Sequence, residues 1–109
     1  MPATCIQVEM SPVPSGFGQV NLTGTAQTWA TIEGSMGIPA AASQQMLRAL
    51  VQVTANAAMV RVDGGAPTTT VGILLPVGFQ QIWMASWLRN AQFINQGAGA
   101  ATLSVQYLQ

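Results

Sequence analysis

Strict alternation of apolar and polar residues near the end of the chain is the feature that most limits how it can fold. Apolar side chains occupy every second position there and polar ones fill the gaps: Ala101, Leu103, Val105 and Tyr107 alternate with Thr102, Ser104 and Gln106. Successive side chains of a β-strand point to opposite faces, so this pattern is typical of a strand with one buried face. The segment is therefore expected to form one strand of a half-buried sheet.

Shorter versions of this pattern recur along the whole sequence, at residues 6–10, 20–22, 28–32, 47–53, 60–62, 71–75, 82–87 and 91–95. Turn-forming residues separate them: the proline-rich segment 12–16 is expected to end the first strand, and 63–67 and 97–99 to form connections. Short strands spaced by turns in a chain of 109 residues predict one all-β domain. We expect a β-sandwich or jelly roll of about seven to nine antiparallel strands.

The expected core takes apolar residues from most of these strands. Its predicted members are Val8, Leu47, Val51, Val60, Val62, Ile73, Phe93, Leu103 and Val105.

The segment 39–50 fits two interpretations. Good helix formers follow Pro39, which suits the first turn of a helix. Against a helix, apolar residues alternate from Leu47 to Val53 and β-branched residues end the run. We expect a loop to about Gln45 followed by a strand.

The segment 82–87 is apolar on both faces, because Ile82 and Met84 alternate with Trp83, Ala85 and Trp87. A strand with this pattern is either central in its sheet or covered by a partner.

The N-terminal third differs in character from the rest. After Met10 it has no strong core pattern and is rich in Pro, Gly, Thr and Asn. Residues 1–37 are therefore expected to form an N-terminal strand and an extended arm, packed on or swapped with the same domain, and residues 38–109 to form the β-sandwich body.

Charged residues are scarce: the chain has three arginines, no lysine, three acidic residues and no histidine, with a formal net charge of zero. Without histidine or lysine it cannot supply a Ser-His-Asp or Cys-His site, a Schiff-base amine or a P-loop. One cysteine and no histidine exclude an ordinary zinc site. Three arginines are too few to neutralise nucleic-acid phosphates. The sequence predicts a non-enzymatic protein with no catalytic, metal or cofactor-binding residues and no nucleic-acid partner.

The three carboxylates and the single thiol fit ordinary structural roles. Asp63 precedes Gly64 and is expected to bond the backbone of its own turn. A productive acid–base pair among Glu9, Glu33 and Asp63 is not expected from so few carboxylates. Cys5 cannot form an intrachain disulfide, since it is the sole cysteine, and is expected to be a small hydrophobe in a protein made under reducing conditions.

No membrane partner is expected. The charge-free run 64–88 is interrupted by prolines, glycines and glutamines, and residues 1–10 lack the basic region of a secretion signal.

The charge deficit predicts self-association, since solvated surfaces usually carry about 25–35% charged residues. Twelve Gln, ten Thr and four Asn supply polarity without the desolvation cost of ions, which suits an assembled interface. Tryptophan and arginine are the residues most often found in interfaces. The candidate interface residues are Trp29, Trp83, Trp87, Arg48, Arg61 and Arg89.

A different class of function rests on the same tryptophans. If Trp83 and Trp87 share a strand face, they and Trp29 would form a platform on which sugars stack, as in carbohydrate-binding modules. This is the alternative hypothesis.

An ordered set of short motifs from Pro39 to Tyr107 resembles small structural proteins of tailed bacteriophages. The motifs are residues 48–53, 60–64, 66–68, 71–72, 75–78, 93–94, 96–100 and 103–107. The resemblance implies a β-sandwich virion component made in the host cytoplasm and located on the capsid surface. It implies a capsid decoration or cement protein that binds the major capsid protein or other virion proteins, with a neck, tail or fibre component as the alternative. Together with the three-fold symmetry of capsid lattices, it favours a trimer among the possible homo-oligomers.

Overall fold

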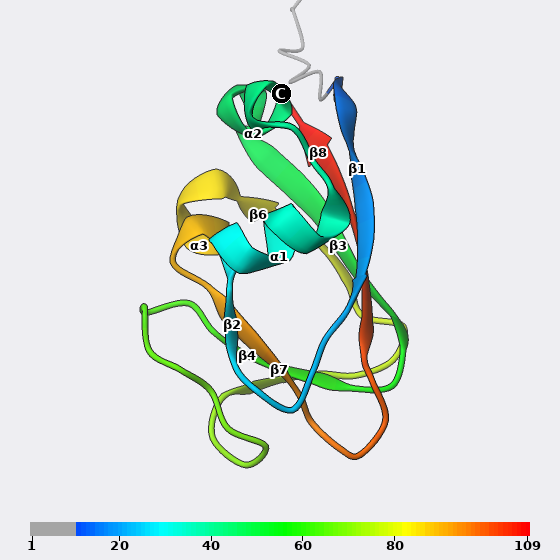
Figure 1. Ribbon diagram of the computed structural model, residues 1–109, viewed down its shortest axis with the longest axis vertical. Helices are drawn as coiled ribbons and strands as arrows, with labels where there is room; N and C mark the ends of the chain where they lie inside the picture. The colour runs from blue at the N-terminus through cyan, green and yellow to red at the C-terminus, as the bar shows by residue number, and fades with distance from the viewer. Residues whose placement is uncertain (1–10) are drawn as a thin grey trace, which may run out of the picture.

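The structure, a computed structural model, describes residues 11–109 and places them in two four-stranded sheets and three short helices (Figure 1). The elements in chain order are β1 (Pro12–Asn21), β2 (Gln27–Thr28), α1 (Trp29–Met36), α2 (Ala40–Gln45), β3 (Arg48–Ala55), β4 (Ala58–Arg61), β5 (Ile73–Leu75), β6 (Gln80–Met84), α3 (Ala85–Arg89), β7 (Gln92–Asn95) and β8 (Thr102–Leu108).

The strand order is that of a jelly roll. The long sheet has the order β1-β8-β3-β6 and the short sheet the order β2-β7-β4-β5, and every pair is antiparallel. Thus β1 pairs with β8, β2 with β7, β3 with β6 and β4 with β5, as if one long hairpin were folded double and rolled up. The predicted all-β sandwich is confirmed, with eight strands within residues 11–109.

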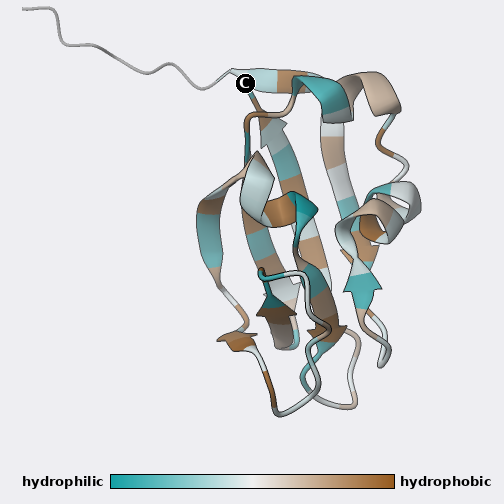
Figure 2. Ribbon diagram, turned by 90° about the vertical axis from the view of Figure 1, so that its left-hand side faces the viewer, coloured by the Kyte–Doolittle hydropathy of each residue, from teal (hydrophilic) through white to brown (hydrophobic). Residues whose placement is uncertain are grey.

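The core lies between the sheets, and period-two alternation puts the side chains there. On β8 the inward-facing Leu103, Val105 and Tyr107 are fully buried, as the sequence predicted. Bands of hydrophobic and hydrophilic residues alternate along the strands (Figure 2). The helices α1 and α2 cover the part of the long sheet that the short sheet leaves free (Figure 1). There, Met36 of α1 lies so close to β1 that a Cβ added at Gly18 would come within 2.6 Å of it.

The segment 12–16, expected to be a break after a first strand, is itself strand, because β1 runs through both prolines to Asn21; the strand expected at 6–10 lies outside the described residues. β1 is an edge strand, and a proline there removes no hydrogen bond of the sheet when its nitrogen faces outward. The pairing with β8 shifts register between Pro12 and Phe17, and Ser15 adopts a φ of 61°. This bulge-like irregularity allows the turn-forming residues to lie within the strand.

The strand expected at 28–32 is also wrong: two residues pair with β7, and α1 follows at once. Thr28 caps the helix by accepting a hydrogen bond from the Thr31 N–H at 3.4 Å, and Gly37 ends it with a φ of 72°. Trp29 and Ile32, one helical turn apart, are both buried. Capping and tertiary packing thus outweigh a short alternating pattern.

Two further local predictions need correction. The segment expected to be a loop up to Gln45 forms α2, whose first turn bonds the Pro39 carbonyl through the N–H groups of Ala42 and Ser43; β3 then begins at Arg48, as expected. The predicted strand 82–87 ends at Met84 and continues as α3. Its strand part, β6, lies at an edge of the long sheet and is not central.

Most of the predicted core is correct. The following predicted members are buried: Val51, Val60, Phe93, Leu103 and Val105. Val62 is half-buried against the core. The prediction that Leu47 and Ile73 belong to the core is wrong, since their side chains are 60% and 58% exposed. Leu47 precedes β3 at the end of the long sheet, and Ile73 lies on the edge strand β5. Val8 lies outside the described residues.

The N-terminal region is integral to the sandwich from residue 12 onward. β1 pairs with β8 along most of its length, and Leu22, Trp29 and Ile32 belong to the core. Of the predicted strand and arm over 1–37, residues 12–37 are therefore packed on the same domain, and residues 1–10 lie outside the described residues.

Candidate functional site

The three tryptophans do not form one exposed platform. Trp29 and Trp83 are buried and lie on either side of Phe93, with ring-centroid distances of 5.8 and 5.9 Å. Trp87 is 55% exposed and belongs to α3, because the chain becomes helical at Ala85. The predicted shared strand face of Trp83 and Trp87 is wrong. Trp29 and Trp83 are core residues, and Trp87 alone has the exposure that a surface contact needs.

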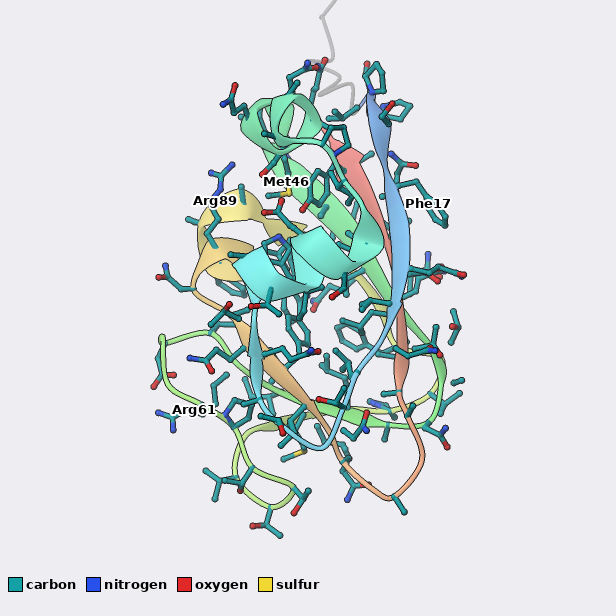
Figure 3. All side chains as sticks on the ribbon, in the orientation of Figure 1. Phe17, Met46, Arg61 and Arg89 are labelled. Atoms are coloured by element: carbon teal, nitrogen blue, oxygen red, sulfur yellow. The ribbon has the colours of Figure 1, made fainter. Side chains whose placement is uncertain are left out.

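The three arginines lie on different elements. Arg61 forms a two-bond ion pair with Asp63, at 2.6 and 3.1 Å. Arg89 of α3 donates to the Ser43 carbonyl at 3.1 Å. Arg48 lies on β3, opposite Met84. Arg61 and Arg89 lie well apart in Figure 3. They therefore do not form one basic patch.

Asp63 has the structural role that the sequence predicted. Its carboxylate accepts a hydrogen bond from the Gly65 N–H at 3.1 Å within its own turn. The hydrogen bond from Arg61 and then that from Gly65 lower the pKa of Asp63 to about 2. The carboxylate is therefore ionised and fully engaged at neutral pH.

A buried polar network ties α1 to β8. The Trp29 indole N–H donates to the Tyr107 hydroxyl at 3.0 Å, and that hydroxyl donates to the Glu33 carboxylate. Burial, followed by the hydrogen bond and charge of Glu33, raises the pKa of Tyr107. Glu33 and Asp63 thus have different partners and do not form a carboxylate pair. Within residues 11–109, no three His, Cys, Asp or Glu residues lie close enough to hold a metal ion.

An apolar pocket of about 150 Å³ opens between the two sheets at the side where β5 and β6 form their edges. Gln81 is the one polar residue in its lining, which consists of Val60, Val62, Ile73, Leu74, Leu75, Phe79, Gln81, Trp83 and Trp87. Ile73, Leu74 and Trp87 are each more than half exposed at its rim. We call the pocket and these three rim residues the edge surface.

The outward side of the long sheet is a second surface, and no other element of residues 11–109 covers it. Strand register aligns its side chains in rows that cross all four strands. One row is Phe17, Gln106, Leu50 and Ile82, and the next is Gln19, Ser104, Gln52 and Gln80. We call these eight side chains the outer face. Phe17 points away from the body of the protein (Figure 3).

The outer face is uncharged and partly organised by its own amides. Gln19 Nε2 donates to Ser104 Oγ at 2.7 Å, and Gln52 Nε2 donates to Gln80 Oε1 at 2.9 Å. Antiparallel sheets with one solvated face usually carry polar and charged residues there. Here, three of the four side chains in the first row are aliphatic or aromatic, and the second row consists of amide and hydroxyl side chains. Such a surface has little to lose in desolvation when another protein covers it.

The interface predicted from the sequence stays a prediction, and the uncovered apolar surfaces contain residues that the sequence did not single out. Ile73 was assigned to the core, although it lies at the rim of the pocket, and the outer face was not identified. The alternating polar positions of β3, β6 and β8 contain no acidic or basic residue except Arg48. That charge-free alternation was the available signal.

Neither a family model, nor a curated protein, nor a solved structure matches this chain. The likeness to phage structural proteins therefore stays a prediction. In the part of the chain that the structure describes, no helix is both long enough and apolar enough to span a membrane.

Proposed function

We propose that this protein is a non-enzymatic structural component of a virion, a capsid decoration or cement protein that bridges neighbouring shell subunits. The outer face is the observation that carries the proposal. No other element of residues 11–109 covers it, and its eight side chains are uncharged apolar, amide and hydroxyl groups on a four-stranded sheet. Covering it removes apolar area from water at about 25 cal/mol per Å² without burying an ion.

The size of this face favours attachment in many copies. Four strands at about 4.8 Å and five residues at about 3.3 Å give a flat area of roughly 300 Å². A stable interface usually buries about 800 Å² on each partner. A single copy would therefore bind weakly through this face alone, and an oligomer that engages several shell subunits would gain by multivalency.

The fold is compatible with this role. Jelly rolls occur in viral capsid proteins, but also in lectins and cupins, so the topology supports the proposal only by analogy. The carbohydrate-binding alternative loses its main support, because two of the three tryptophans are buried.

The first test is mass spectrometry of purified particles from cells in which the protein is made. A copy number comparable to the number of shell subunits supports decoration, whereas a copy number equal to the subunits of a single ring indicates a neck component. Absence from the particles rejects every virion role.

The second test locates the contact. Gln106→Lys places an ammonium group at the centre of the outer face, where Gln106 is half-buried. Burying that charge without a partner should lower affinity for shells lacking the protein by at least about 30-fold, or roughly 2 kcal/mol. The matched control is Gln96→Lys, which makes the same change at an exposed position between β7 and β8. Equal binding by both variants in a co-sedimentation assay would reject the outer face as the contact.

A further inference from the structure

Within residues 11–109, the backbone of β6 is unpaired on one side. β6 pairs with β3 and ends the order of the long sheet. Near the two ends of this ladder, the Ala85 N–H donates to the Leu47 carbonyl at 3.1 Å and the Val53 N–H to the Phe79 carbonyl at 2.9 Å. Hydrogen-bonded residues alternate along an antiparallel pair, so the backbone groups of Ile82 point to the free side. An edge of this kind can accept a further strand.

A strand added to β6 would also close the pocket of the edge surface. The side chains of Gln81 and Trp83 point from β6 into this pocket. Residues opposite them on an added strand would point the same way, because paired residues share a face. Every second side chain of the occupant must therefore be apolar and small enough for a cavity of about 150 Å³.

Residues 6–10 of the sequence meet this requirement, since Ile6, Val8 and Met10 alternate with Gln7 and Glu9. The sign of charge also fits: residues 11–109 contain three arginines and two carboxylates, and Glu9 is the one charged residue among the first ten.

The strand cannot come from the same copy. Pro12, Leu108, Arg48 and Met84 lie in one row across the long sheet. A strand beyond β6 would lie four strand spacings from β1, which is about 19 Å. Two Cα–Cα steps of about 3.8 Å join Met10 to Pro12. Met10 therefore cannot reach the far side of β6 in its own chain, and a strand that includes all of residues 6–10 cannot pair there.

The other edge of the long sheet is a poorer acceptor. β1 contains Pro12 and Pro14 and a register shift, which interrupt the row of backbone donors. The pocket also lies beside β6 and not beside β1.

We propose that residues 6–10 of one copy add as a strand to the free edge of β6 in a second copy, with Ile6, Val8 and Met10 facing the pocket. This contact joins copies of the chain to each other. It does not depend on the proposed virion role, and it leaves most of the outer face free for another partner.

Disulfide trapping tests the contact in the full-length protein, because Cys5 is the sole natural thiol. Cys5 alternates with Ile6 and so should share the outward side of the added strand with the side chains of Gln80, Ile82 and Met84. Three single variants, Gln80→Cys, Ile82→Cys and Met84→Cys, are oxidised with a glutathione redox buffer. We expect an intermolecular disulfide from Cys5 to at least one introduced thiol. The matched control is Gln19→Cys, which faces the same way on β1. Each variant is repeated with Cys5→Ser, which should remove the cross-link.

A second pair of variants tests the apolar side of the strand. Val8→Asp should at least halve the oligomeric fraction measured by native mass spectrometry, whereas Gln7→Asp should leave it unchanged. Circular dichroism of both variants checks that the sandwich still folds. A monomeric natural chain, equal effects of the two variants, or cross-linking at position 19 as strong as at β6 would each overturn the proposal.

Discussion

Replacing Tyr107 by phenylalanine removes one hydroxyl group from the centre of the protein and leaves the ring in place. That hydroxyl accepts the Trp29 indole N–H at 3.0 Å and donates to the Glu33 carboxylate. Trp29 and Tyr107 are 1% and 0% exposed. In Tyr107→Phe the indole N–H therefore remains buried without an acceptor, and the carboxylate loses its donor.

Two losses set the expected size of the effect. A buried donor without a partner costs about 1–3 kcal/mol, and a hydrogen bond to an ionised group contributes about 1.5–3 kcal/mol. Because the two bonds share one hydroxyl, their contributions do not simply add. We expect the free energy of unfolding to fall by about 3 kcal/mol and Tm to fall by more than about 10 °C.

The same hydroxyl makes stability depend on alkaline pH. Burial and the neighbouring Glu33 raise the pKa of Tyr107 above its ordinary value of 10.0. Above that pH the unfolded chain releases the phenolic proton while the folded chain keeps it. The stabilisation is complete below the unfolded pKa and is lost as the pH rises above it, by about 1.4 kcal/mol per pH unit. Tyr107→Phe should lack this loss.

The composition makes the tyrosinate absorbance specific to one residue. The chain contains no lysine and a single tyrosine, so tyrosinate absorbance reports on Tyr107 alone. Denaturant unfolding, followed by tryptophan fluorescence across the alkaline range, gives the stability of both proteins. Glu33→Gln is the control, because it keeps an acceptor oxygen and removes the charge; its effect should be smaller. A change below about 0.5 kcal/mol in Tyr107→Phe, or ionisation of the folded tyrosine at its ordinary pKa, would refute the reasoning.

Three further predictions concern other parts of the structure. Phe93→Ala removes the ring between the two buried indole rings and should reduce the free energy of unfolding by about 3–5 kcal/mol in denaturant titrations. A reduction of less than half of that would show that the packing of the two indole rings does not require the Phe93 ring. Gly37→Ala adds a Cβ where φ is 72° and should cost about 1 kcal/mol, whereas Gly34→Ala, inside the same helix and facing open space, should stabilise or be neutral. The Asp63 carboxyl should titrate by NMR with a pKa of about 2, and Arg61→Gln should move that pKa back toward 3.8. Any stabilisation from this exposed pair is present above the ordinary pKa and is lost as the pH falls toward 2; an unchanged pKa in the variant would exclude the ion pair as its cause.

The sequence alone determined the fold class and the position of most strands. Period-two alternation is a local property, and it identifies the buried face of a strand wherever that strand lies between two layers. The alternating residues of β8 are buried as predicted because β8 is central in the long sheet and faces the core along its length. The same holds for Val51 on β3 and Phe93 on β7. The charge deficit likewise predicts self-association, which stays a prediction.

Only the tertiary structure decided which apolar residues stay exposed. Ile73 and Val60 have similar local patterns, yet Val60 lies on an inner strand and Ile73 at an edge. Strand order depends on contacts between residues far apart in the chain, and those contacts leave no mark in a short window of sequence.

The tryptophans show the same limit most clearly. Trp83 and Trp87 are four residues apart, and one is buried in the core while the other is exposed on a helix. The change from strand to helix at Ala85 separates them, and a window of alternating apolar residues does not reveal it. Local sequence thus determined which residues form strands and which of their side chains are apolar. The packing of the two sheets decided which of those apolar side chains are buried in the core of this chain.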